Sequence, residues 1–511
     1  MTIKKTMITT IKTCAVIGLN CEPVEVEVDL NRGQSFFGII GLPDKSIQEA
    51  TDRLRSALKN SGIPFPSNKR LIINLAPADV RKEGPAYDLP MAVGIILSVL
   101  ELKPDLTNHL FIGELALEGN LRPTHGILPI AIYAKERGIK TLCLPKANIA
   151  EASLIPGLEL IPLDNLNQLI AHLRNEKNIK PIQSPGLVTT DTINNLTLDL
   201  SLVKGQQQAK RALEIAAAGG HNILMTGPPG AGKTLLAKTL PSILPPLTTE
   251  EILEVTKIYS VAGLLPTDQP IITERPFRSP HHSSSGAALV GGGKNPRPGE
   301  ISLAHRGILF LDEFPEFNRQ VIENLRQPLE DGVVTICRAA GSLAFPARFT
   351  LVASQNPCPC GFATDPHKPC ICTPSQINNY RRKISGPILD RIDLHLEVPR
   401  LEFDKLTSDN PTDESSTIRS AVSQARQIQH RRFAGSKIIT NAEMGPKEIK
   451  KFCQVDNAGF DLIKNAVNQL HLSARAYHRI LKVARTIADL ATEEKIKVEY
   501  LAEALQYRIK S

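Results

Sequence analysis

The chain of 511 residues predicts an α/β fold, and three observations support this prediction. An apolar run at 222–226 precedes a glycine-rich loop and then a helical pattern at 235–240. A second apolar run at 307–311 ends in two acids, as expected of a buried parallel strand. Residues 1–175 mix short strand patterns with helical ones. We therefore expect an α+β region followed by an α/β core with a phosphate-binding loop.

The composition is that of an ordinary globular protein, and the length fits about three domains. The net charge of +8 permits a polyanionic partner, while the absence of Trp argues against a binding surface built mainly on stacking. No apolar run is long enough to span a membrane, and the N-terminus lacks an apolar signal core. We expect a cytoplasmic protein with no membrane partner.

In the first region, residues 24–29 and 70–75 read as strands. The patterns at 47–60 and 88–102 predict an amphipathic helix and an apolar helix. A polar segment with Lys-Pro and Ser-Pro-Gly then predicts a linker at 176–198.

A second polar segment, 407–416, divides the remainder of the chain. We place a core region at 199–400, before this segment, and a helical region at 401–511, which includes it. Within the helical region, Ser473 is a candidate N-cap. Arg475, Arg479 and Lys482 follow at a spacing that predicts one basic helix face.

The glycine-rich segment fills every position of a phosphate-binding loop, so a plain turn before a helix is disfavoured. Glycines let consecutive backbone N–H groups turn toward the phosphates, and the helix N-terminus adds its positive end. Lys233 supplies a mobile charge, and the Thr234 hydroxyl suits Mg²⁺. The residues predicted to bind ATP and Mg²⁺ are Gly227, Pro228, Pro229, Gly230, Ala231, Gly232, Lys233, Thr234 and Asp312.

The two acids that end the apolar run at 307–311 predict hydrolysis of the bound nucleotide. Asp312 would hold Mg²⁺ through water, and Glu313 would polarise the attacking water. Alone, an apolar run ending in Asp-Glu is equally typical of a solvated strand end. Its position after a phosphate-binding loop makes an ATPase the favoured reading.

Four cysteines, Cys358, Cys360, Cys370 and Cys372, form two C-x-C pairs. Four thiolates so close in sequence suit tetrahedral Zn²⁺, with His367 as a substitute ligand. Unliganded thiols, disulfides and an iron–sulfur cluster are the alternatives, of which disulfides are disfavoured in a reducing compartment. A loop rich in Gly, Pro and Asp has no apolar core of its own, so a bound metal ion would stabilise its fold.

The chain resembles the AAA+ ATPases of the magnesium-chelatase-like group, specifically the bacterial ComM/YifB family, over essentially its whole length. The strings that carry the resemblance are Ala209 to Asn222, Phe277 to His282, Leu289 to Gly293, Pro296 to His305 and Asn356 to Gly361. The resemblance implies a P-loop AAA+ module with a helical lid, preceded by an α+β Lon-protease-like domain. It also implies a homo-hexameric, ATP-driven DNA helicase that promotes branch migration in recombination during natural transformation.

Three further site residues follow from the resemblance alone. Asn356 would lie beside the attacking water, where a strand-end cap is the alternative. Arg391 would reach the nucleotide of a neighbouring subunit, where a salt bridge with Asp390 or Asp393 is the alternative. Arg475 would touch the γ-phosphate from the lid, where a solvated basic face is the alternative.

Related helicases insert loops into a central pore, and two segments here resemble such loops. Residues 281–297 are glycine-rich and weakly basic, and 332–348 alternate like a hairpin. Lys294, Arg297 and Arg338 are the candidates for contacts with single-stranded or branched DNA, with ordinary surface loops as the alternative.

The first region resembles the Lon protease domain, but Ala86 stands where the family has its nucleophilic Ser, and Lys135 is displaced by one residue. Without the hydroxyl, peptidase chemistry is absent, and a scaffold or DNA clamp is expected. An alternative for the whole chain is a magnesium-chelatase-type motor subunit that drives metal insertion through a partner. Residues 413–417 superficially resemble a D-x-S-x-S metal-binding motif. Recombination proteins are further candidate partners.

Overall fold

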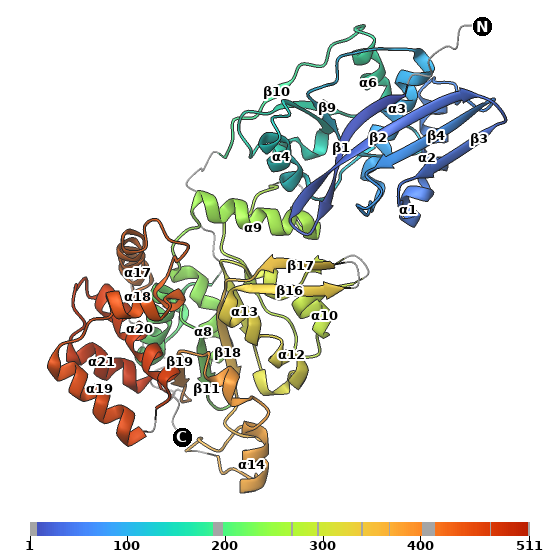
Figure 1. The fold of residues 1–511 in the computed structure, drawn as a ribbon. Helices are drawn as coiled ribbons and strands as arrows, with labels where there is room; N and C mark the ends of the chain where they lie inside the picture. The colour runs from blue at the N-terminus through green and yellow to red at the C-terminus, as the bar shows by residue number, and fades with distance from the viewer. Residues whose placement is uncertain are drawn as a thin grey trace. The chain divides into compact units, whose positions relative to one another are not determined.

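The computed structural model describes residues 8–187, 198–266, 269–293, 296–338, 341–366, 368–400, 414–470 and 472–508 (Figure 1). The chain forms two compact units. Unit 1 contains residues 1–192 together with 249–272, and unit 2 contains 193–248 together with 273–511. Unit 1 therefore includes a segment that the sequence places inside the expected core at 199–400.

Unit 1 contains a four-stranded sheet with the order β1-β2-β4-β3, in which only the β3/β4 pair is parallel. Its strands are β1 (Thr9–Ile17), β2 (Asn20–Arg32), β3 (Phe36–Ile40) and β4 (Lys69–Ala76). Val24, Val26 and Val28 are buried and alternate with exposed or half-buried Glu residues, so the middle of β2 buries one face. The predicted strands at 24–29 and 70–75 are thus confirmed within longer elements.

Helices of unit 1 also match the sequence patterns closely. The pattern at 47–60 corresponds to α1 (Lys45–Gln48) and α2 (Ala50–Asn60), and the pattern at 88–102 corresponds to α3 (Asp88–Leu100). α3 is buried on nearly all sides because it packs against β1, β2 and α2. Ala86 lies in a short 3₁₀ turn, Pro85–Tyr87, just before this helix.

A second sheet of unit 1 uses residues that the sequence assigned to a linker. Its order is β10-β9-β8-β5, formed by β5 (His109–Phe111), β8 (Thr141–Pro145), β9 (Glu159–Leu163) and β10 (Ile182–Gln183). β10 pairs antiparallel with β9, and the buried Ser184 hydroxyl donates 2.7 Å to the Ser153 carbonyl. The first part of the expected linker at 176–198 is therefore part of the fold of unit 1.

Helix α9 (Thr249–Ala262) belongs to unit 1, although its sequence follows the phosphate-binding loop of unit 2. It packs against α4 (Ile127–Glu136), the helix that carries Lys135. The Ser260 hydroxyl donates 2.5 Å to Glu151, and the Gly126 N–H donates 3.1 Å to the Ser260 carbonyl. Burial raises the pKa of Glu151, so this contact occurs in the interior of unit 1.

The packing of α9 within unit 1 predicts that a chain without the rest of unit 1 is less soluble. A chain that begins at residue 198 retains unit 2 but leaves the apolar side of α9 without its packing surface. We expect this chain to aggregate, as measured by light scattering. The control is the same chain with residues 249–272 replaced by a flexible Gly/Ser linker, which we expect to be monodisperse. Equal behaviour of the two chains would contradict the role given to α9.

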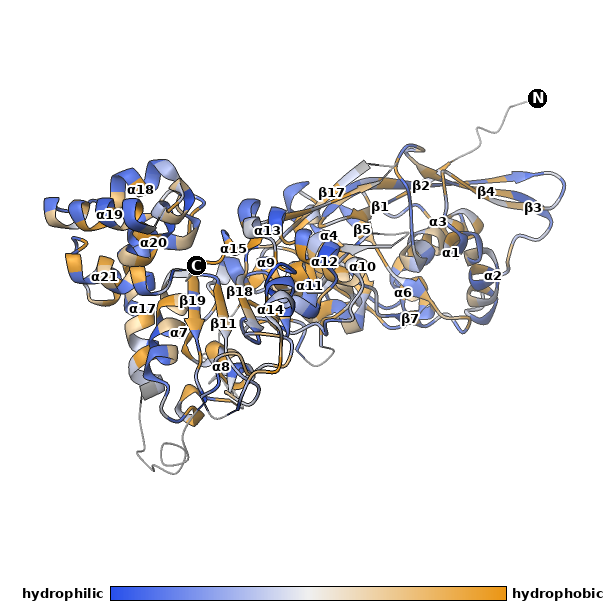
Figure 2. Cartoon of the chain, turned by 90° about the horizontal axis from the view of Figure 1, so that it is seen from below, coloured by the Kyte–Doolittle hydropathy of each residue, from blue (hydrophilic) through white to orange (hydrophobic). Residues whose placement is uncertain are grey.

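Unit 2 is built on a five-stranded sheet with the order β12-β15-β18-β11-β19, and every pair in it is parallel. The strands are β11 (Ile223–Thr226), β12 (Phe277–Arg278), β15 (Ile308–Leu311), β18 (Thr350–Gln355) and β19 (Leu394–Glu397). Figure 2 shows the apolar colouring of β11. β11, β15 and β18 are buried almost throughout, as their unbroken apolar runs predict.

The C-terminal part of unit 2 is helical, as the sequence predicts. The helices are α17 (Glu414–Arg432), α18 (Pro446–Phe452), α19 (Asn457–Leu470), α20 (Ala474–Leu490) and α21 (Val498–Gln506). The Ser473 side chain accepts the Ala476 N–H, which confirms the expected N-cap of α20. One apolar cluster joins these helices to the sheet. No helix among the described residues is long and apolar enough to cross a membrane.

Candidate nucleotide site

The phosphate-binding loop connects β11 to α8 (Lys233–Thr239) at the carboxyl edge of the parallel sheet. The geometry of this loop requires glycine at several positions. A Cβ at Gly227 would lie 2.2 Å from the Val398 carbonyl oxygen, and Gly232 has a φ of +85°. Larger residues at these positions would move the backbone, so the loop conformation depends on its sequence.

Lys233 points back into the loop. It is 8% exposed, and its Nζ donates to the Gly227 carbonyl (2.6 Å), the Pro228 carbonyl (3.0 Å) and Asn356 Oδ1 (3.2 Å). Burial lowers the pKa of Lys233, while the carboxylates of Asp312 and Glu313 act in the opposite direction. The geometry brings Lys233 and Asn356 together, although they are far apart in sequence.

Asp312 lies at the end of β15 and contacts the loop directly. The Thr234 hydroxyl donates 2.8 Å to Asp312 Oδ2, and the Ser354 hydroxyl donates to Asp312 Oδ1. A hydroxyl and a carboxylate at this distance are oxygen donors of the kind that Mg²⁺ prefers. The sequence patterns did not single out Ser354. Its position on β18, two residues before Asn356, could have indicated that it lies at this site.

Glu313 follows Asp312 with a left-handed backbone, at φ 52° and ψ 46°. A non-glycine residue in this region is uncommon and marks a conformation imposed by its surroundings. Its carboxylate Oε2 lies 3.4 Å from His282 Nδ1, a contact that the sequence analysis did not predict.

Arg391 and Arg475 meet at one carboxylate. Arg391, which follows α15 (Gly386–Leu389), pairs with Glu330 Oε2, and Arg475 Nη2 lies 2.8 Å from Glu330 Oε1. The Arg391 guanidinium lowers the pKa of Glu330, and Arg475 adds to the effect. The partner of Arg391 is thus neither Asp390 nor Asp393, the two acids considered from the sequence.

The expected basic face of α20 is only partly exposed. Arg479 donates to the Leu389 and Ile392 carbonyls, and Lys482 donates 2.8 Å to the Ala442 carbonyl. Burial lowers the pKa of both side chains. Arg475 differs from them because it is 45% exposed. The three cations lie on one helix at the predicted spacing, but only Arg475 forms no hydrogen bond to a backbone carbonyl among the described contacts.

The four cysteines of the loop come together as the sequence suggests. Their Sγ atoms all lie within 4.8 Å of one another, and none of the four forms a disulfide. Cys358 Sγ is 3.3 Å from Cys360 Sγ and 3.7 Å from Cys370 Sγ. The backbone N–H of Phe362 lowers the pKa of Cys360 to about 6, which favours a thiolate. This donor set fits a tetrahedral zinc ion. His367 lies outside the described residues.

The cysteine loop also touches the nucleotide loop. A Cβ at Gly361 would lie 2.6 Å from Pro229 Cδ and 3.9 Å from Asn356 Cγ. Cys358 follows Asn356 by two residues and is fully buried. A metal bound by the four thiolates would therefore fix the backbone beside both Asn356 and the phosphate-binding loop.

The loops proposed to contact DNA are described in part. Lys294 lies outside the described residues. Arg297 is exposed on β14 (Arg297–Pro298), which pairs with β13 (Gly291–Gly292). The predicted hairpin at 332–348 is confirmed as β16 (Val333–Arg338) paired with β17 (Gly341–Pro346). Arg338 ends β16, and its side chain lies outside the described residues.

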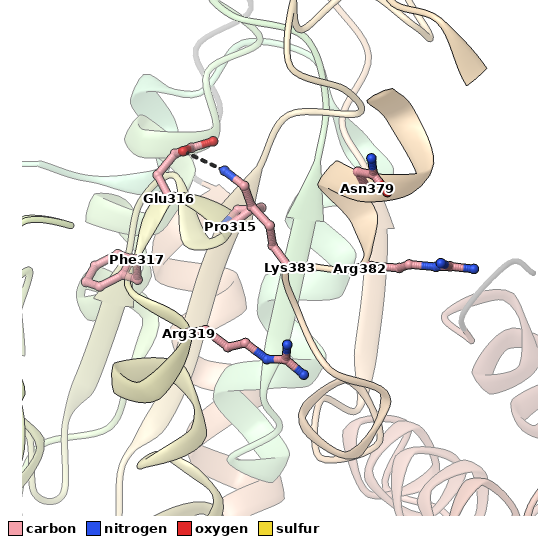
Figure 3. Close-up of a pocket in the computed structure, with 7 residues that line it drawn as sticks. All are labelled: Pro315, Glu316, Phe317, Arg319, Asn379, Arg382 and Lys383. Atoms are coloured by element: carbon pink, nitrogen blue, oxygen red, sulfur yellow. Dashed lines mark hydrogen bonds and ion pairs between the residues drawn. The ribbon is translucent and has the colours of Figure 1, made fainter. Parts of the chain in front are cut away.

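A cavity of 430 Å³ opens beside the end of β15, between the turn after Glu313 and the end of α14 (Pro374–Arg381). Its lining consists of Pro315, Glu316, Phe317, Arg319, Asn379, Arg382 and Lys383. Figure 3 shows Lys383 reaching Glu316, at 2.9 Å, while Arg382 extends away from the pair. The lining thus includes three cations and one acid, and only Lys383 pairs with that acid, so the excess of positive charge suits a phosphate group.

Comparisons with protein families agree with this geometry. The family model for magnesium chelatase, subunit ChlI, matches residues 199–406. The model for subunit ChlI of Mg-chelatase matches 26–148, and the model for the C-terminal part of the subunit matches 412–508. The matches to subunit ChlI include the nucleotide site and the helical segment that follows it, which supports a magnesium-chelatase-like ATPase.

Relatives that match along nearly the whole chain identify the family more closely. Competence protein ComM of Haemophilus influenzae is 45% identical over 501 residues, covering 97% of this chain and 96% of the relative. Protein YifB of Escherichia coli, which is uncharacterized, is 42% identical over 501 residues, covering 98% of this chain and 96% of the relative. Magnesium-chelatase subunit ChlI of Euglena gracilis is 22% identical and covers 56% of this chain and 76% of the relative. The chain therefore belongs to the ComM/YifB family, within the magnesium-chelatase-like group.

Proposed function

We propose that the chain is an ATP-dependent DNA translocase that promotes branch migration in recombination during natural transformation. One observation carries the enzymatic part: Lys233, Thr234 and Asp312 lie together at the carboxyl edge of a parallel sheet, with Glu313 next in sequence. The name of the Haemophilus relative, a competence protein, supports the biological setting. We place this activity in the cytoplasm.

In this reaction, the loop amides and Lys233 bind the β- and γ-phosphates of ATP. Thr234 and Asp312 would hold Mg²⁺, which would supply positive charge to neutralise the phosphates. Glu313 orients the attacking water and accepts its proton, and Asn356 binds the same water. Lys233 must leave the Gly227 and Pro228 carbonyls to reach the phosphates, which its long side chain permits.

We infer that the working form is a homo-hexameric ring. Arg391 and Arg475 share Glu330, so an anion that took the place of this carboxylate would meet both guanidinium groups. An acceptor on a neighbouring subunit would replace Glu330 and recruit both arginines together. Hydrolysis would then require subunit contact, as expected for arginine fingers supplied in trans.

DNA contacts are proposed for Lys294, Arg297 and Arg338, with the cations of the cavity as additional phosphate ligands. Unit 1 would serve as a scaffold or DNA clamp without peptidase activity, since Ala86 supplies no nucleophile. Recombination proteins are the proposed partners.

The deciding experiment measures ATP hydrolysis without DNA, with single-stranded DNA and with branched DNA, and follows strand exchange on a synthetic junction. Stimulation by DNA together with junction migration is the expected result. The family match favours one alternative, a magnesium-chelatase-type motor that drives metal insertion through a partner. Hydrolysis that is indifferent to both DNA forms would contradict the translocase and favour that alternative.

Zinc bound by the four cysteines is a further prediction. Freshly reduced protein should contain about one zinc per chain, measured by elemental analysis. Replacing Cys370 and Cys372 by Ser should remove the metal and lower thermal stability, because no metal ion then cross-links the loop. Replacement of the distant Cys337 by Ser is the control and should leave the zinc content unchanged. Wild-type protein without metal would contradict the site.

A further inference from the structure

His221 is a fully buried histidine that contacts two separate parts of unit 2. It follows α7 (Gln207–Gly219) and precedes β11, the strand that leads into the phosphate-binding loop. Its Nδ1 lies 3.2 Å from Asp393 Oδ2, and its Nε2 lies 2.8 Å from Thr486 Oγ1 on α20. Both ring nitrogens therefore have partners, one on the segment between α15 and β19 and the other on a helix.

The segment between α15 and β19 carries Arg391, and buried contacts hold its backbone. Asp393 lies two residues after Arg391, and Asp393 Oδ2 also accepts the Asn222 N–H at 3.3 Å. The Asn222 side chain donates 3.0 Å to the Arg391 carbonyl, and its Oδ1 accepts the Leu351 N–H of β18 at 2.8 Å. His221 and Asn222 therefore join the backbone around Arg391 to the parallel sheet.

We propose that His221 is a positioning residue for Arg391, because it holds Asp393 and thereby the backbone turn from which the Arg391 side chain extends. The proposal rests on the ATPase function proposed above. A carboxylate only accepts hydrogen bonds, so the His221 Nδ1–H is the donor to Asp393. Burial acts to raise the pKa of Asp393, but the hydrogen bond from His221 acts in the opposite direction and the pKa is lowered. Loss of this N–H would leave a buried carboxylate without its histidine partner.

The two residues before His221 leave room for its ring. A Cβ at Gly219 would lie 2.3 Å from the His221 ring and 2.6 Å from Thr486 Oγ1. Gly220 has a φ of +70°, and a Cβ there would lie 2.8 Å from Thr440 Oγ1. The ring is therefore closely enclosed, and this packing fixes the direction in which its N–H groups point.

Helix α20 contacts the turn of Arg391 at a second place. Arg479 donates to the Leu389 and Ile392 carbonyls, which lie on either side of Arg391 in the sequence. Arg475, on the same helix, shares its carboxylate partner with Arg391. The buried histidine thus adds another connection between the helix and the turn that carry the two arginines. Because Arg479 would remain, we expect loss of the histidine to displace Arg391 rather than remove it from the site.

The test compares His221→Leu, which has no N–H, with His221→Asn, which keeps an N–H donor toward Asp393. We expect kcat for ATP to fall about 10- to 100-fold in His221→Leu, since misplacing a group by about 1 Å can cost about 10²-fold. KM should stay constant, because the phosphate-binding loop is unchanged, and His221→Asn should retain most of the activity. If thermal unfolding shows that His221→Leu does not fold, Thr486→Val replaces it and should lower kcat about three- to ten-fold.

A double variant shows whether His221 acts through Arg391. In the Arg391→Ala background, His221→Leu should cause no further loss of kcat, because the side chain that it positions is absent. The matched control is His305→Leu, which removes another buried ring of unit 2 whose Nδ1 accepts the Arg348 N–H at 3.0 Å. Any effect of this control on kcat should persist in the same background. An unchanged kcat in His221→Leu, or an equal loss with and without Arg391, would overturn the proposal. This result does not depend on which subunit Arg391 serves.

Mixed rings locate the defect and separate this proposal from the ATPase function. If Arg391 acts in trans, Lys233→Ala protein should restore activity to His221→Leu protein, because it supplies an intact Arg391 turn. Arg391→Ala protein should not restore it, because neither partner supplies one. Rescue by Arg391→Ala protein would place the defect in the nucleotide site of the His221→Leu subunit and overturn the proposal. A wild-type protein that binds a fluorescent ATP analogue and never hydrolyses ATP would instead refute the ATPase function.

Discussion

Replacing Glu313 by Gln should reduce ATP turnover by about 10²- to 10⁴-fold, the usual contribution of a positioned general base. The amide keeps the shape of the side chain but cannot accept the proton of the attacking water. Nucleotide affinity should stay close to wild type, because Lys233 and Thr234 provide the phosphate and Mg²⁺ contacts. Steady-state phosphate release and equilibrium binding of an ATP analogue measure the two effects separately.

Glu316→Gln is the matched control for this experiment. Glu316 lies three residues after Glu313 in the same turn, and its partner is Lys383 in the cavity rather than a residue of the nucleotide site. Its replacement should leave basal turnover within about a factor of two, as expected for an exposed ion pair. Turnover near wild type in Glu313→Gln would remove Glu313 from the catalytic role.

Replacing Arg391 by Ala should reduce hydrolysis by about 10³- to 10⁵-fold, the range of arginine fingers, while ATP still binds. Mixing this protein with Lys233→Ala protein should restore part of the activity. In a mixed ring, an intact phosphate-binding loop on one subunit faces an intact Arg391 on the next. Hydrolysis is measured as a function of mixing ratio, with co-assembly followed by sedimentation.

Two control variants test whether the result is specific to Arg391. Arg381→Ala removes an exposed arginine at the end of α14 and should not require complementation. Glu330→Gln removes the charge that both arginines share. ATP hydrolysis should be retained or increased if Glu330 only binds the arginines and takes no part in the reaction. Absence of rescue at every mixing ratio, despite co-assembly, would mean that Arg391 serves its own subunit.

The sequence by itself determined the elements that depend on local patterns. The unbroken apolar strands of unit 2 predicted a buried parallel sheet, and the loop at 227–234 follows directly from its glycines. Ser473 was recognisable as an N-cap because capping requires only a side chain and the next turn of backbone. Within each C-x-C pair the cysteines stay close because one residue separates them, and the nine residues between the pairs form the loop that brings all four together.

Only the tertiary structure decided which distant side chains meet. Glu330 brings Arg391 and Arg475 together, His282 reaches Glu313, and α9 joins unit 1 although its sequence lies within the expected core. Helical spacing alone placed Arg479 beside Arg475, but α15 and the segment after it provide carbonyls that bury Arg479. These pairings depend on how elements remote in sequence pack, and local patterns contain no information about the surface on the other side of a contact.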